Sequence, residues 1–157
     1  MGESLRSKML RLGFNFFPVY RRTGARITYI DDCWTEVRIR LPLNLWTRNY
    51  VGTLYGGSMY AAVDPIFMVM LIKVLGPNYV VWLKEATISF RKPGRGTLYA
   101  RFLLDDAEIR RIRDELATKP SLEKIYNVDL TDAEGVVHAS IRETLYIAGK
   151  KRSVQPE

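Results

Sequence analysis

The chain has 157 residues, of which 47% are apolar and 26% are charged, and its net charge is +7. Length and composition are those of one ordinary globular domain, so residues 1–157 are expected to form a single unit. The chain has a single cysteine, Cys33, so it cannot form an intrachain disulfide. With one cysteine and one histidine in the whole sequence, a conventional zinc site is also excluded. We expect a reducing, cytoplasmic setting and no metal or other cofactor.

Membrane-spanning and nucleic-acid-binding functions are disfavoured by the same composition. No apolar run approaches the ~20 residues that a transmembrane helix needs. The longest run, 63–75, contains Asp64, Pro65 and Lys73. The N-terminus lacks the small-residue cleavage site of a signal peptide. The basic residues are scattered in twos and threes, which favours a solvated surface, with a few cations available for the phosphates of a nucleotide-like ligand.

The first predicted element is a helix over residues 4–17. Its apolar residues recur at helical spacing and form one stripe: Leu5, Met9, Leu12 and Phe16. Pro18 is expected to end the helix. Residues 1–24 therefore form an N-terminal helix that acts either as a lid or as a cover on the core, with the cover favoured.

Two strands and a buried helix follow. Strands are predicted at 25–31 and 34–41, the second from alternation of apolar and charged residues, with a turn at Asp31 and Asp32. Residues 57–75 are apolar on almost every side, which predicts a buried helix that Pro65 kinks.

The remaining elements predict one antiparallel sheet. Four strands are expected, with a helix that begins at Asp105 or Asp106 inserted among them; the strands are 79–91, 97–104, 122–131 and 136–148. Neighbouring strands and tight turns favour antiparallel pairing, and the apolar helix needs to be wrapped. The fold class is therefore α+β, with a curved sheet around a central helix, a core at 25–148 and a basic tail at 149–157.

The segment before the central helix carries the candidate chemistry. Gly56 and Gly57 precede the helix N-terminus, where free backbone N–H groups and the helix dipole favour negative charge. This arrangement is suited to an oxyanion hole for acyl transfer. Asp64 follows about two turns later, in a stretch where an unpartnered carboxylate is costly. On these grounds alone, a functional and a structural role for Asp64 are evenly matched.

The segment resembles a known family. The pattern Asn49-x-x-Gly52-Thr53-Leu54-x-Gly56-Gly57, with Asp64 seven residues after the second glycine, is similar to hotdog-fold acyl-CoA thioesterases of the phenylacetyl-CoA type. The stretch 88–96, with its Pro-then-Gly turn, is similar to a second signature of that family. The resemblance covers roughly residues 25–148, and the whole chain is most similar to a less characterised branch of the superfamily.

The resemblance implies a mechanism. Asp64 matches the family's carboxylate, which serves as general base on water or as nucleophile. Asn49 matches the asparagine that holds the water or the carboxylate, and Gly56, beside Gly57, matches the backbone N–H that polarises the thioester carbonyl. In the family the site spans a dimer interface, so Asp64 is expected to act with Asn49 and Gly56 of another chain.

Two positions depart from the family pattern. Tyr55 stands where the family usually has histidine; a phenol can donate a hydrogen bond but cannot copy histidine's acid–base behaviour. Leu83 stands where a serine or threonine is common. The neighbouring Lys84 interrupts an apolar strand face, so one hypothesis is that it pairs with Asp64; the alternative is a pair with Glu85 or an exposed lysine at the dimer edge.

We expect hydrolysis of an acyl thioester, with coenzyme A or an acyl carrier protein as the carrier, by a homodimer or tetramer. Substrate contacts are expected from Tyr55, Thr53 and Lys84, and phosphate contacts from the basic residues of the 88–96 stretch: Arg91, Lys92 and Arg95. An apolar wall is expected from Tyr55, Met59, Tyr60, Phe67, Met68 and Trp82. His138 is expected to be structural. The alternative function is non-catalytic binding of acyl thioesters on the same fold.

Overall fold

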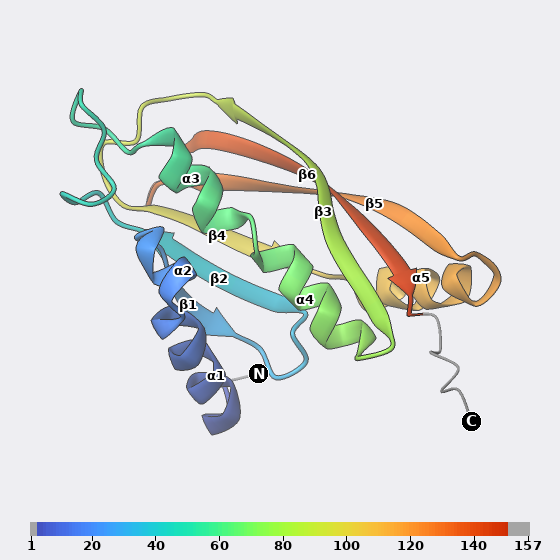
Figure 1. Ribbon diagram of the computed structural model, residues 1–157. Helices are drawn as coiled ribbons and strands as arrows, with labels where there is room; N and C mark the ends of the chain where they lie inside the picture. Colours follow the sequence, from blue (N-terminus) through green and yellow to red (C-terminus); the bar gives the residue numbers. More distant parts are fainter. Residues whose placement is uncertain (1–2, 151–157) are drawn as a thin grey trace.

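The computed structural model describes residues 3–150 and consists of one curved sheet wrapped around a central helix (Figure 1). The six strands are all paired antiparallel, in the order β1-β2-β4-β5-β6-β3. Most of the predicted basic tail, residues 151–157, lies outside the described residues. The strands are β1 (Arg26–Ile30), β2 (Glu36–Leu41), β3 (Tyr79–Phe90), β4 (Leu98–Leu103), β5 (Ser121–Thr131) and β6 (Val137–Gly149). The helices are α1 (Leu5–Phe16), α2 (Pro18–Arg22), α3 (Gly56–Val63), α4 (Ile66–Leu75) and α5 (Asp106–Thr118).

The central helix is divided into α3 and α4 at Asp64 and Pro65. Proline has no backbone N–H and its ring obstructs the preceding turn, so the predicted kink is confirmed as a break between two helices. The segment Gly56–Leu75 has the length and hydropathy of a membrane span, but half of its most apolar window is buried inside the fold. Burial against a sheet explains this hydropathy, because a core helix is apolar on most of its sides.

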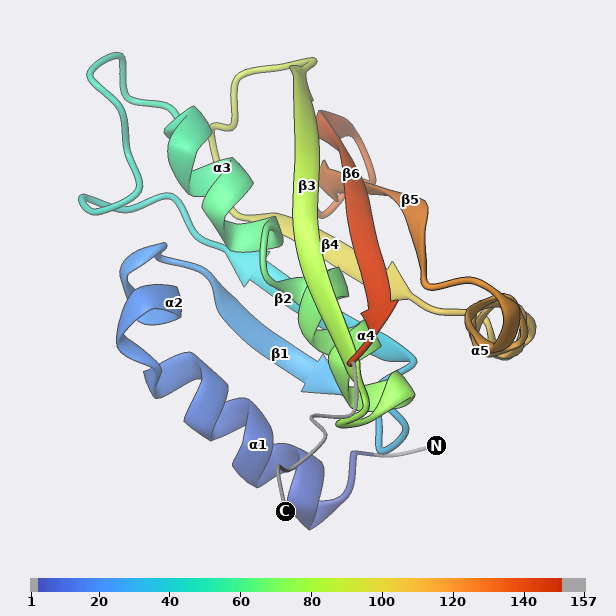
Figure 2. The ribbon, with the colours of Figure 1, turned by 45° about the vertical axis from the view of Figure 1, so that its right-hand side comes forward.

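The N-terminal helices lie beside the central helix, while α5 lies at the opposite side of the molecule (Figure 2). The apolar stripe of α1 does not pack on the core, because Leu5 is 77% exposed and Phe16 is 64% exposed. The inward face instead presents Asn15, whose side-chain amide donates to Ile27 O at 2.9 Å and accepts from Ile27 N at 2.8 Å. Because β1 is an edge strand, its free backbone groups need polar partners, and Asn15 supplies them.

A β-bulge changes the inward face of β3. The register against β6 shifts between Leu83 and Glu85. Before the bulge, Val81 is buried and Trp82 is 64% exposed, so the expected inward position of Trp82 is wrong. One extra residue reverses the side-chain alternation of a strand, and simple period-two counting cannot anticipate it.

Candidate functional site

The loop before α3 is held together by Asn49. Its side-chain oxygen accepts from Val51 N at 3.1 Å and Thr53 N at 3.0 Å, and its Nδ2 donates to Thr53 Oγ1 at 2.9 Å. Gly52 completes the turn with a φ of 83°, which favours glycine. The amide that was expected to hold a water is therefore engaged inside its own loop, and Asn49 fixes the path of the chain towards the glycine pair.

The N-terminus of α3 begins with two glycines that pack closely against aromatic rings. A Cβ on Gly56 would lie 2.7 Å from Cζ of Phe90, and a Cβ on Gly57 would lie 2.3 Å from the Tyr55 ring. Tyr55 is the N-cap residue but makes no side-chain cap hydrogen bond. The first N–H groups of α3 thus have no side-chain cap, as an oxyanion-binding helix end requires.

A small cleft of about 350 Å³, here called the basic cleft, gathers many of the predicted residues. Its lining includes Asn49, Thr53 and Gly56 from the loop and helix, and Arg91 and Lys92 from the end of β3. The backbone joins these segments, because Leu54 N donates to Gly94 O at 2.8 Å. The fold thus brings Gly56 together with two of the three basic residues, whereas Gly57 and Arg95 do not line the cleft.

His138 holds the segment that carries the cations of this cleft. One ring nitrogen lies 3.1 Å from Pro93 O and the other lies 3.0 Å from Oδ2 of Asp132. The His138 carbonyl accepts from the backbone N–H groups of Arg91 and Lys92. The expected structural role of His138 is confirmed, and its function is to fix the turn that carries the cations.

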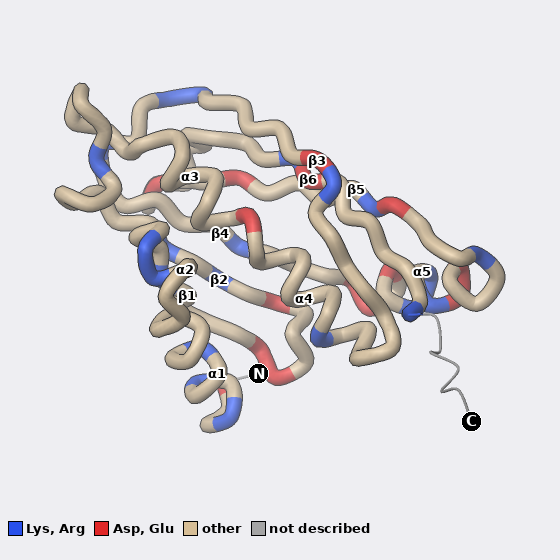
Figure 3. Tube along the Cα trace, in the orientation of Figure 1, with Lys and Arg blue, Asp and Glu red and all other residues tan. Residues whose placement is uncertain are grey.

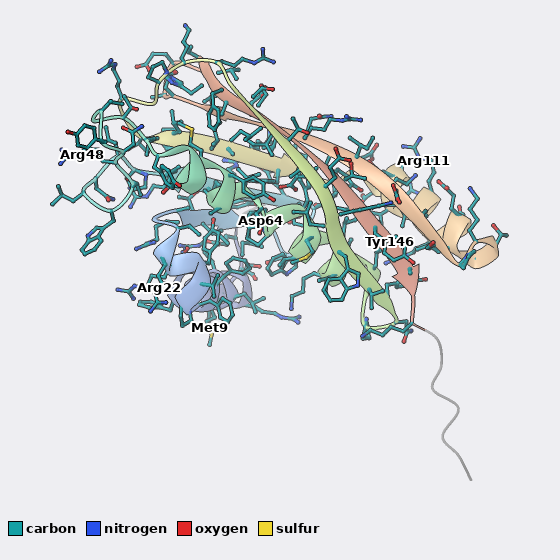
Figure 4. The ribbon with its side chains drawn as sticks, turned by 45° about the horizontal axis from the view of Figure 1, so that its top comes forward. Met9, Arg22, Arg48, Asp64, Arg111 and Tyr146 are labelled. Atoms are coloured by element: carbon teal, nitrogen blue, oxygen red, sulfur yellow. The ribbon has the colours of Figure 1, made fainter. Side chains whose placement is uncertain are left out.

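Asp64 lies at the break between the two central helices, near the middle of the molecule (Figure 4). Its side chain is half-buried, and the hydroxyl of Tyr60 donates to its Oδ1 at 2.9 Å. Burial, followed by this hydrogen bond and the charge of Asp64, raises the pKa of Tyr60. Tyr60 therefore remains a neutral donor that orients the carboxylate at neutral pH.

Asp64 borders a groove of about 780 Å³ between the N-terminal helices and the central helix, here called the apolar groove. Its volume falls within the ~300–1,000 Å³ range of small-molecule sites. Aromatic and aliphatic side chains make up most of the lining, which includes Met9, Phe14, Phe17, Tyr20, Trp34, Pro65, Met68 and Val69. Such a lining suits an apolar chain whose polar end reaches the carboxylate.

A second carboxyl group near Asp64 was missed from the sequence. Glu143 is 0% exposed, and neither of its side-chain oxygens has a hydrogen-bond partner within residues 3–150. It lies on β6 directly between Ala86 of β3 and Tyr126 of β5. Burial and then the charge of Asp64 raise its pKa to about 8. The signal was available, because period-two alternation places Glu143 in the middle of the apolar face of β6.

The remaining predicted residues lie elsewhere. The hypothesis that Lys84 pairs with Asp64 is wrong, because its ammonium group is exposed and bonds to Glu123. That ion pair, a charge-assisted hydrogen bond, raises the pKa of Lys84. Tyr55 is 57% exposed. Arg95 is exposed in the turn beside the basic cleft but does not line it. Met59 and Phe67 are both buried in the core, and of the two only Met59 reaches the lining of the basic cleft.

The matching family model covers residues 6–147 and is described as a domain of unknown function, DUF4442. The chain belongs to the DUF4442 family. A search of curated proteins found no match. The expected membership of a less characterised branch is confirmed.

Solved structures share the fold of this DUF4442 chain. PA5026 from Pseudomonas aeruginosa, described as a protein of unknown function and probable thioesterase, has 21% identity and a TM-score of 0.81 over 94% of this chain and 98% of its own. Thioesterase HI1161 from Haemophilus influenzae has 15% identity and a TM-score of 0.69 over 98% and 97%. A mutant form of thioesterase PA1618 from Pseudomonas aeruginosa has 13% identity and a TM-score of 0.67 over 90% and 93%. At these identities the likeness establishes the fold, and the predicted hotdog fold is confirmed.

Proposed function

We propose that this DUF4442 protein hydrolyses acyl thioesters, with the acyl chain in the apolar groove and the thioester carbonyl beside Asp64. The observation that carries the proposal is the position of Asp64, whose half-buried carboxylate borders an apolar groove of about 780 Å³. An acyl chain needs an apolar site, and its reacting carbon needs a base at the end of that site. The thioesterase descriptions of PA5026 and HI1161 favour the same chemistry.

In the proposed reaction Asp64 removes a proton from water as the water oxygen attacks the thioester carbon. The resulting oxyanion is stabilised by the backbone N–H of Gly56 at the start of α3. Collapse of this intermediate breaks the carbon–sulfur bond, and the proton held by Asp64 leaves with the thiol. The products are a carboxylic acid and a free thiol. Tyr60 orients the carboxylate through its hydrogen bond to Oδ1.

The site is proposed to be completed by a second copy of the chain. Asp64 lines the apolar groove, whereas Gly56 and Asn49 line the basic cleft. Within one chain, the residues expected to form the catalytic site therefore lie in two separate cavities. The 12-residue strand β3 forms one edge of the sheet. A long free edge is a template for pairing with another chain. Pairing of two β3 strands would bring Asp64 of one copy towards the basic cleft of the other.

The carrier is proposed to be coenzyme A. Arg91 and Lys92 provide two exposed cations on the rim of the basic cleft, and Arg95 adds a third nearby. Phosphate groups on a carrier are attracted by such a cluster, and the interaction weakens as salt is raised. An acyl carrier protein presents a phosphate on its prosthetic arm, so it remains the second candidate carrier.

A thiol-release assay on a panel of acyl-CoA thioesters tests the activity. The exposed Cys33 reacts with thiol-trapping dyes, so both enzymes should carry Cys33→Ser. We expect Asp64→Asn to lower kcat by about 100-fold to 10,000-fold, the usual contribution of a general base. The matched control is Asp129→Asn on the exposed side of β5, which should leave the rate unchanged. Equal rates for Asp64→Asn and the parent enzyme would refute the proposed role of Asp64.

The alternative is a non-catalytic acyl-thioester binder. It is favoured by Tyr55 in place of the family's histidine and by the engagement of Asn49 in its own loop. Calorimetric titration with a non-hydrolysable acyl-CoA thioether separates the two functions. Tight binding without turnover on any thioester of the panel supports the binder.

A further inference from the structure

The N-terminal helices carry an unusual distribution of charge. Residues 4–30 contain six basic residues and no acidic residue, although the whole chain has 17 acidic residues. Two of the six are engaged: Arg11 pairs with Glu3 at 2.7 Å, and Arg26 donates to the backbone oxygen of Ala25. The other four are exposed: Arg6, Lys8, Arg21 and Arg22. Figure 3 shows the basic positions along α1 and α2.

An exposed apolar stripe runs between these cations. It consists of the four residues at helical spacing on α1 and two at the junction with α2. Their exposed fractions are 77% for Leu5, 67% for Met9, 51% for Leu12, 64% for Phe16, 60% for Phe17 and 72% for Val19. On a helix, Arg6 and Lys8 fall on either side of the stripe, and the Arg21 guanidinium lies 5.2 Å from the centre of the Phe16 ring. The polar face of α1 is already used, because Asn15 binds the edge of β1.

We propose that the α1–α2 face docks on an anionic lipid surface. A helix with an exposed apolar stripe and flanking cations lies in the plane of a bilayer interface, with its apolar side among the acyl chains and its cations on the headgroups. A second copy of the same face is a poor partner, because a symmetric contact would bring the four exposed cations of each copy together. The exposed Asp32, which hydrogen-bonds to Ser4 and Ser7 at the start of α1 and interacts with Arg6, offsets only part of that charge.

The same face leads to the apolar groove. Met9, Phe17 and Val19 belong both to the apolar stripe and to the groove lining, and Asp64 lies on the groove's other wall. A lipid surface on this face would therefore adjoin the groove entrance. The docking inference stands on the stripe and the charges alone, so it does not require the proposed thioesterase activity.

Vesicle co-sedimentation of the full chain tests the docking. We expect binding to vesicles that contain phosphatidylglycerol, little binding to phosphatidylcholine alone, and release at high salt. Arg21→Gln with Arg22→Gln should weaken binding about 30-fold, at ~1 kcal/mol for each cation near the surface. The control is Arg110→Gln with Arg111→Gln on exposed positions of α5, at the far end of the molecule from Met9 and Arg22 (Figure 4).

The apolar contribution is tested separately. Leu12→Gln with Phe16→Gln should abolish sedimentation with anionic vesicles, while Leu103→Gln, at a position with a similar exposure of 52%, should not. Circular dichroism should report an unchanged fold for all variants, since every altered side chain is exposed. Equal binding to neutral vesicles, or equal losses in the α5 control, would overturn the proposal. So would self-association that depends on Leu12 and Phe16 in the absence of lipid.

Discussion

The buried carboxyl of Glu143 should make the stability of the protein depend on pH in a specific way. Glu143 is fully buried without a hydrogen-bond partner in the described chain, and its pKa is raised from 4.5 to about 8. The groups that face it are Asp64 and Tyr60 from the central helix and Tyr126 from β5. The informative substitution is Glu143→Gln, which keeps the shape of the side chain and removes its ionisation.

The size of the effect follows from linkage. Below about pH 4.5 Glu143 is protonated in both the folded and the unfolded chain, so it contributes no pH dependence there. Between pH 4.5 and about 8 the unfolded chain loses the proton and the folded chain retains it. The free energy of unfolding therefore falls by ~1.4 kcal/mol for each pH unit in this window, and by on the order of 5 kcal/mol in total. Above this window the loss is complete.

Urea denaturation followed by tryptophan fluorescence, at pH values across this window, measures the effect. Glu143→Gln should become more stable than the parent as pH rises, with the difference levelling off above about pH 8. Glu134→Gln, in an exposed turn, is the matched control. A difference between Glu143→Gln and the parent that stays constant across the window would refute the assignment of Glu143 as a buried, protonated carboxyl.

Three further predictions test the site and the fold. Mixing an Asp64→Asn chain with an Asn49→Ala chain should restore about a quarter of the parent activity. With random pairing, about half of the dimers contain one chain of each kind, and one of the two shared sites in such a dimer is intact. No restoration would exclude a shared site. Met68→Trp should fill the apolar groove and shift the preferred acyl chain to a shorter length in the thiol-release assay, and an unchanged preference would place the chain elsewhere. Asn15→Ala should lower the free energy of unfolding, measured by urea denaturation, by ~1–3 kcal/mol, because the backbone N–H and C=O of Ile27 lose their partner. An unchanged denaturation midpoint would show that this contact does not stabilise the fold.

Some parts of the candidate site were readable from the sequence because they depend on local chemistry. The glycine pair, Asn49 and the basic turn lie within short segments, and a backbone hydrogen bond from Leu54 to Gly94 joins them. Glu143 was missed although the alternation of β6 marked its position. The role of a carboxyl group on an apolar strand face can be interpreted only when its spatial neighbours are known. Asp64 lies 79 positions earlier in the chain, so the sequence did not indicate that the two groups are close.

The sequence by itself determined the strands, the break at Pro65 and every helix except α2, because periodicity, capping residues and proline act over a few residues. The short α2 was missed, since Pro18 was expected only to end the first helix. The tertiary structure decided which faces are used. The side chain of Asn15 on α1 hydrogen-bonds to the backbone of the edge strand β1, and in this orientation the apolar stripe of α1 is exposed. A bulge beside Lys84 reversed the faces of β3, and Lys84 paired with Glu123 instead of Asp64. Each outcome depends on partners that are remote in sequence, which local patterns do not specify.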